Sequence, residues 1–280
     1  MQFGISTHLY HGDRLDRDHL VEIAAHGFEV VEIFATRTHV DYHDAAALAD
    51  LRAHLADTGL RAHSVHAPIA EGLRDGVWGP AFSLATSDEA ARQVAVDETR
   101  AALRAAAALD AGIVVVHLGV PLAQGPDSRD NRLDAARRSL ETLVDDAASL
   151  RVRLALEVIP NPISEAEALV RFIEEDLDVD HVGICLDSGH AFMMGDLIDA
   201  IEVVSGHLIT THLHDNHRRS DDHLVPFDGG IDWAAAAMTL QKVGYDGVWM
   251  FELGADGPPR RILEKAQEAR RRLEGFLTGP

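Results

Sequence analysis

The chain has 280 residues, of which 46% are hydrophobic and 25% are charged. This is the composition of a globular protein with enough apolar material for a large core, and it excludes a fibrous or wholly disordered chain. Asp and Glu outnumber Lys and Arg by 46 to 25, which gives a formal net charge of −21. Because this charge repels nucleic acid and anionic membrane surfaces, we expect neither as a partner.

The single cysteine, Cys185, excludes an internal disulfide and a metal site built from several cysteines. No stretch approaches the roughly 18 consecutive apolar residues of a membrane-spanning helix. The first residues, MQFGISTHLY, lack the basic and long apolar regions of a signal peptide. These features predict a soluble cytoplasmic protein. The chain also has 17 histidines, many of them beside carboxylates, which suits metal ligation.

Short apolar runs rich in β-branched residues alternate with longer helical patterns from one end of the chain to the other. Eight such pairs in a chain of this length favour an α/β fold, a single (β/α)8 TIM-barrel domain over residues 1–280, with an open parallel sheet as the alternative. The predicted strands are Gln2–Ser6, Glu29–Phe34, Arg61–His66, Ile113–His117, Arg153–Val158, His181–Asp187, Leu208–His214 and Gly247–Glu252.

A helix is expected after each strand. Helical spacing is clearest over Asp88–Leu109, Asp130–Leu150, Ser164–Glu174 and Pro259–Phe276. Four glycines stand where helices should end in a left-handed residue before the next strand: Gly27, Gly59, Gly112 and Gly244.

Two long irregular stretches, Ala67–Ser87 and Asp215–Gly230, each follow a predicted strand. In a parallel barrel they therefore lie on the face where active sites are built. The first contains Trp78 and Phe82 among glycines, which is typical of a lid that stacks on substrate and also of a surface loop anchored by aromatic packing.

The third to eighth predicted strands all end in side chains that bind metals. Strands of a parallel barrel end on one rim, so these side chains become neighbours although they are far apart in sequence. The six residues are His66, His117, Glu157, Asp187, His212 and Glu252.

Each of these residues also has an ordinary structural interpretation. A single buried histidine is more often hydrogen-bonded than metal-bound, and Asp187 could cap a helix, although Ser188 could take that duty. Glu157 and Glu252 are harder to explain, because burying an unpaired carboxylate costs several kcal/mol. Since neighbouring strand ends carry no Lys or Arg, a metal cation is the simplest partner.

These residues resemble the sugar phosphate isomerase/epimerase family of xylose isomerase-like barrels, a superfamily that includes the type IV apurinic endonucleases. The likeness covers nearly the whole chain and is most specific in SVHAP, VVHLG, ALEV, CLDSGHAF, HLHDN, DDHLVPFDGGIDW and FEL.

The resemblance implies one divalent ion, Mn²⁺, Mg²⁺, Co²⁺ or Zn²⁺, held by Glu157, Asp187, His212 and Glu252. It implies that the two glutamates also transfer protons. It further implies that His190 binds substrate and that Arg218 contacts substrate hydroxyls. His66, His117 and Trp78 are additional candidates for substrate binding.

The endonuclease branch implies a second interpretation, a site for three metal ions. Its nine ligands match His66, His117, Glu157, Asp187, His190, His212, Asp221, His223 and Glu252. The net charge and the lack of a basic, aromatic-bearing loop argue against DNA as the substrate.

We therefore predict a metal-dependent isomerase or epimerase that moves a proton through an enediolate of a keto sugar, sugar phosphate or related polyol. A phosphoesterase with several metal ions, a lyase on a similar substrate and a non-catalytic binding protein are the alternatives. The resemblance also implies that the chain pairs into a homo-oligomer.

Overall fold

The computed structural model describes residues 1–177, 181–255 and 257–278, and its main feature is a closed barrel of eight parallel strands in the order β1-β10-β9-β8-β7-β6-β3-β2. This confirms the predicted α/β TIM barrel. The barrel strands are β1 (Gln2–Ser6), β2 (Val30–Phe34), β3 (Arg61–His66), β6 (Ile113–Val116), β7 (Arg153–Glu157), β8 (Val182–Asp187), β9 (Leu208–Leu213) and β10 (Val248–Phe251).

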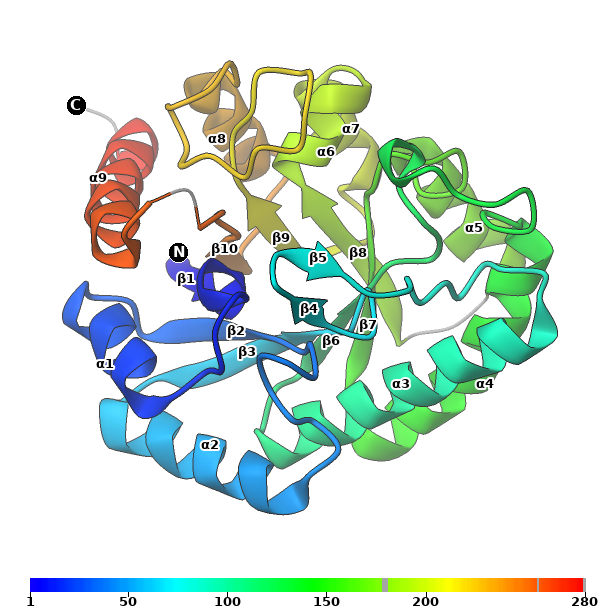
Figure 1. Cartoon of the computed structure of the whole chain (residues 1–280). Helices are drawn as coiled ribbons and strands as arrows, with labels where there is room; N and C mark the ends of the chain where they lie inside the picture. The colour runs from blue at the N-terminus through cyan, green and yellow to red at the C-terminus, as the bar shows by residue number, and fades with distance from the viewer. Residues whose placement is uncertain (178–180, 256, 279–280) are drawn as a thin grey trace.

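Helices surround the barrel (Figure 1). The α-helices are α1 (Arg17–Ala25), α2 (Ala45–Thr58), α3 (Glu89–Ala108), α4 (Leu133–Leu150), α5 (Ala166–Asp176), α6 (Ser188–Met194), α7 (Leu197–Val204), α8 (Trp233–Lys242) and α9 (Pro259–Thr278). Two short 3-10 helices, η1 (Thr7–Tyr10) and η2 (Leu122–Gln124), follow β1 and β6. Among the described residues, no helix combines the length and the apolar character needed to cross a membrane.

The strands of the barrel are buried on both sides, which explains their apolar sequences. Every residue of β6, with the sequence IVVV, and of β8, with the sequence VGICLD, is buried. Register then decides which polar residues meet at the rim. Asp187 at the end of β8 lies directly beside His212 in β9, and Glu157 at the end of β7 lies beside Cys185.

The helix ends agree with three of the four glycine predictions. Gly27, Gly59 and Gly244 have positive φ angles of 75°, 74° and 80°. The prediction for Gly112 is wrong, because the left-handed residue after α3 is Asp110, with a φ of 57°. Asp tolerates this conformation better than most side chains, so the turn is completed two residues before the glycine.

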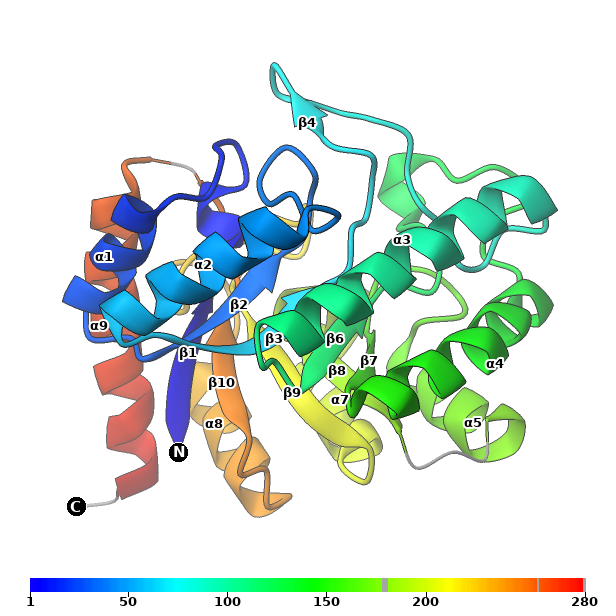
Figure 2. The ribbon, with the colours of Figure 1, turned by 90° about the horizontal axis from the view of Figure 1, so that it is seen from below.

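The sequence predicts an irregular segment after β3, but part of this segment is regular in the structure. It contains an antiparallel hairpin of β4 (Leu73–Arg74) and β5 (Val77–Trp78), whose turn includes Gly76 at a φ of 76°. Figure 2 shows this hairpin projecting beyond the carboxyl ends of the strands. It therefore stands over the rim that collects the polar residues.

Candidate metal centre

Four residues from consecutive strands of the barrel converge at its carboxyl-terminal rim. We refer to Glu157, Asp187, His212 and Glu252 as the four-ligand group. Each offers one oxygen or nitrogen atom, and these atoms all lie within 4.8 Å of one another. All four side chains are buried. The geometry thus brings together the residues for which the resemblance implied a metal ion.

The chemistry of this group fits a divalent cation. Three carboxylates and one imidazole are ligands for Mn²⁺, Co²⁺ and Zn²⁺, and the carboxylates also suit Mg²⁺. Within the part of the chain that the structure describes, the ion pairs of Glu157 and Glu252 are all with histidines. Since no permanent cation neutralises these buried carboxylates there, a metal ion would supply the missing positive charge.

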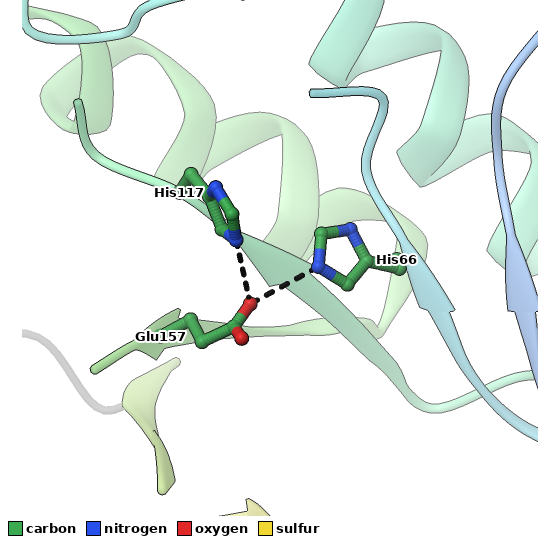
Figure 3. Close-up of side chains that lie close together, drawn as sticks. All are labelled: His66, His117 and Glu157. Atoms are coloured by element: carbon green, nitrogen blue, oxygen red, sulfur yellow. Dashed lines mark hydrogen bonds and ion pairs between the residues drawn. The ribbon is translucent and has the colours of Figure 1, made fainter. Parts of the chain in front are cut away.

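Two further histidines contact Glu157: His66 at the end of β3 and His117 directly after β6. The Nε2 atoms of His66 and His117 both lie 3.0 Å from Glu157 Oε2 (Figure 3). His66 also donates from Nδ1 to the carbonyl oxygen of Ala67 at 2.8 Å. Burial alone would lower the pKa of His66, but the hydrogen bond and charge of Glu157 raise it to about 9. These three residues form another group that could hold an ion.

A second polar cluster adjoins the four-ligand group. We refer to Asp221, His190, His214 and His223 as the Asp221 group. Asp221 Oδ2 lies 3.1 Å from the Nε2 atoms of both His190 and His223, while His214 Nε2 lies 3.0 Å from Asp187. The ligand atoms of His214, Asp221 and His223 also lie close enough to hold an ion.

Asp187 joins these two clusters and also begins a helix. Its Oδ1 accepts a hydrogen bond of 2.7 Å from the backbone N–H of His190, so it is the N-cap of α6. The alternative, capping by Ser188, is wrong, because that hydroxyl donates instead to the carbonyl of His214 at 2.8 Å. Asp187 thus orients His190 through the helix that it caps.

The loop that carries Asp221 is held by a buried carboxylate that the sequence interpretation missed. Asp215 accepts hydrogen bonds from the indole of Trp233 at 2.8 Å and from the backbone N–H groups of Asn216, Phe227 and Ile231. A carboxylate with four donors is well satisfied, so this residue fixes the loop path without needing a metal.

Arg218 does not point toward the four-ligand group. It has a φ of 66°, its guanidinium lies 3.8 Å from the centre of the Phe192 ring, and it donates to the carbonyls of Phe192 and Gly195. These contacts place the guanidinium at the carboxyl end of α6, where it satisfies exposed carbonyl groups. Its expected contact with substrate hydroxyls remains a prediction.

Trp78 connects the hairpin to the rim through a row of rings. It stacks on His11 with ring centres 5.6 Å apart, and His11 stacks on His8 at 4.5 Å. His8 in turn lies 4.8 Å from His223 of the Asp221 group. Burial, together with the charges of His223 and His11, holds the pKa of His8 well below its ordinary value. His8 is therefore a neutral part of the wall of the site.

The sequence interpretation also missed Glu32, although a signal was present. This glutamate interrupts the apolar sequence VVEIF of β2, just as Glu157 interrupts β7. It is fully buried and lies 3.1 Å from His212. As with Glu157 and Glu252, a carboxylate inside an apolar strand is the signal, but Glu32 lies in the middle of its strand and not at the end.

The fold and the rim define a class of protein: a parallel α/β barrel with clustered carboxylate and histidine ligands at the carboxyl ends of its strands. The profile of the xylose isomerase-like TIM barrel family matches residues 20–274. The chain belongs to this family.

Some of the relatives of this chain are named as sugar epimerases. The L-ribulose-5-phosphate 3-epimerase UlaE of Salmonella paratyphi A is 25% identical over 248 residues, which are 86% of this chain and 83% of that protein. The structure of a D-tagatose 3-epimerase-like protein superposes with a TM-score of 0.80 at 26% identity, covering 99% of this chain and 97% of the other.

The zinc-bound structure of the IOLI protein shares the fold, with a TM-score of 0.76 at 18% identity and 98% coverage of both chains.

Proposed function

We propose that this protein is a divalent-metal-dependent epimerase or isomerase of a keto sugar or a related polyol. The observation that carries the proposal is the four-ligand group, in which three buried carboxylates and a histidine converge without a permanent cation among the described residues. The relatives named as sugar epimerases support the reaction class, and the IOLI protein, which shares the fold, binds a zinc atom.

A divalent ion held by Glu157, Asp187, His212 and Glu252 would polarise the substrate carbonyl and stabilise the negative charge that develops on its oxygen. Glu157 and Glu252 would then transfer the proton. One carboxylate removes the proton from the carbon beside the carbonyl, and the other returns a proton to the opposite face, which inverts that carbon. Return of the proton to the adjacent carbon gives isomerisation instead.

The surrounding residues would orient the sugar and exclude water. His66 and His117 contact Glu157 and so lie within reach of a ligand at that carboxylate. His190 borders the other side of the group, 3.4 Å from Asp187. Trp78 on the hairpin is 37% exposed and offers an apolar surface for the C–H groups of a sugar. We assign all four to substrate binding.

Proton exchange with solvent tests this proposal. The protein loaded with Mn²⁺, Mg²⁺, Co²⁺ or Zn²⁺ is incubated in D₂O with free and phosphorylated ketoses, and the products are followed by NMR. We expect deuterium to replace the proton on the carbon beside the carbonyl. We also expect a second sugar to appear that is an isomer of the substrate, with no group lost. Loss of a water or phosphate group would instead indicate a lyase.

Glu252→Gln should lower the rate of deuterium exchange and the rate of product formation by about 10²- to 10⁴-fold. Glu268→Gln, on the exposed side of α9, is the matched control. The proposal is wrong if no ketose exchanges with any of the four ions, or if metal-loaded Glu252→Gln retains the rate of the unaltered protein.

A phosphoesterase with several metal ions is the second candidate, because the Asp221 group could hold an additional ion. The relatives do not favour it. Elemental analysis of the purified protein distinguishes the two. One tightly held ion per chain supports the epimerase, whereas two or three ions, with phosphodiester hydrolysis that is lost in His223→Ala, would replace it with the hydrolase.

A further inference from the structure

Glu32 lies in the middle of β2, behind the four-ligand group. Its side chain is fully buried. Its Oε2 accepts a hydrogen bond from Ser64 at 2.8 Å and lies 3.1 Å from His212 Nε2. Its Oε1 has no hydrogen-bond partner among the described residues. A carboxylate so placed is costly to bury, which calls for an explanation beyond packing.

The imidazole of His212 separates Glu32 from the other carboxylates. Its Nδ1 lies 3.2 Å from Glu157 Oε1 and 3.4 Å from Glu252 Oε2, so this nitrogen faces the four-ligand group. Its Nε2 faces Glu32 on the opposite side of the ring. The two nitrogens therefore have different duties.

The chemistry of the imidazole fixes these duties. A histidine that binds a metal is neutral and carries one proton, on the nitrogen that does not bind. An ionised carboxylate only accepts hydrogen bonds, so Glu32 requires the proton of His212 to be on Nε2. The lone pair of Nδ1 then points toward Glu157 and Glu252, where the ion would bind.

We propose that Glu32 is a positioning residue that sets the tautomer and ring orientation of His212 for binding a divalent cation. This inference rests on the metal site of the proposed function. Glu32 acts through His212 and does not itself belong to any group of residues whose ligand atoms are close enough to hold an ion. Its negative charge makes the imidazole a stronger electron donor and adds to the attraction for the cation.

A purely structural role would have a different consequence. If Glu32 only filled the barrel interior and satisfied Ser64, Glu32→Gln would preserve its shape and one acceptor oxygen, and only thermal stability would change. In the positioning role the negative charge also makes His212 a stronger electron donor, so Glu32→Gln should weaken metal binding even in a folded protein. Metal affinity therefore separates the two roles without reference to turnover.

The test is calorimetric titration of metal-free protein with Mn²⁺. We expect Glu32→Gln to raise the dissociation constant by about 10- to 100-fold. Glu98→Gln is the control, because Glu98 is also largely buried and contacts a histidine but lies outside the rim. It should bind Mn²⁺ as the unaltered protein does. An unchanged affinity in folded Glu32→Gln would overturn the proposal.

Nitrogen NMR of the unaltered, Zn²⁺-loaded protein with ¹⁵N-labelled histidine provides a test that does not depend on any variant. We expect the proton of His212 on Nε2, and a proton on Nδ1 would overturn the proposal. If the unaltered protein binds no divalent ion, the proposed function itself fails. If it binds Mn²⁺ and the Glu32→Gln variant binds it equally well, only the role of Glu32 fails.

Discussion

The rim of the barrel and the outer surface beside α3 both bury a glutamate against histidine. Among the residues that the structure describes, a permanent cation pairs with the glutamate of the outer region and not with the one at the rim. Glu98 on α3 contacts Arg37 at 2.5 Å, His43 at 2.9 Å and the hydroxyl of Tyr42 at 2.5 Å. We refer to these four residues as the outer network. Glu157 at the rim has four histidines around it and no such cation among the described residues.

This difference explains why two similar carboxylates have different roles. Burial alone would raise the pKa of Glu98, but hydrogen bonds from Tyr42 and His43, together with the charges of His43 and Arg37, hold it below its ordinary value. The outer network is thus complete by itself and stabilises the fold. The rim concentrates negative charge instead, which leaves it able to bind a cation from solution.

Among the tests of this difference between the rim and the outer network, replacement of Glu157 should have the largest effect. We expect Glu157→Gln to lower turnover by about 10²- to 10⁴-fold and to weaken metal binding, because it removes a charged ligand and a proton-transfer group together. Steady-state rates and titration with Mn²⁺ measure the two losses. Retention of both in a folded variant would show that the rim carboxylates do not need a cation.

Adding a metal ion to metal-free protein should give the next largest effect. An ion that binds only the folded state, at 100 times its dissociation constant, stabilises it by about 2.7 kcal/mol. For a chain of this size, that raises the melting temperature by about 5 °C. Calorimetry should show this rise in the unaltered protein and in Glu98→Gln, but not in Asp187→Asn. An equal rise in all three would place the ion elsewhere.

Glu98→Gln should affect stability rather than metal binding. We expect a loss of about 1–3 kcal/mol at neutral pH, because Arg37 and His43 lose their buried partner. The pKa of Glu98 is lowered in the folded state, so its stabilising contribution is fully present above the pKa of the unfolded chain, near 4.3. It is lost as the pH falls through the folded pKa. Urea unfolding of both proteins should therefore show a difference that shrinks toward pH 3.

Trp78→Ala should have the smallest effect, a rise in KM of a few-fold with little change in kcat. The ring contacts of Trp78 among the described residues are with His11 and Phe34, and neither belongs to the four-ligand group. Saturation kinetics on the ketose identified by deuterium exchange measure the two constants. A large fall in kcat would instead give the hairpin a part in the chemistry.

The sequence alone did not specify the direction of every side chain or the residue that ends every helix. The left-handed backbone of Arg218 and the Phe192 ring direct its guanidinium to the end of α6, while its contact with substrate hydroxyls stays a prediction. Gly112 was expected to end a helix, but Asp110 does so. Spacing alone could settle neither case, because each depends on the packing around the turn.

The sequence by itself determined the barrel and the residues at its rim. Alternating apolar strands and helices allow few arrangements, and parallel strands of a barrel end on one face, so the convergence of His66, His117 and Glu157 follows from the chain order. Only the tertiary structure decided which nitrogen of His212 faces the other ligands and that Glu32 lies behind it. The physical reason is that a strand pattern specifies which face a side chain occupies, whereas its hydrogen-bond partners depend on rotamers and on neighbours brought from distant strands.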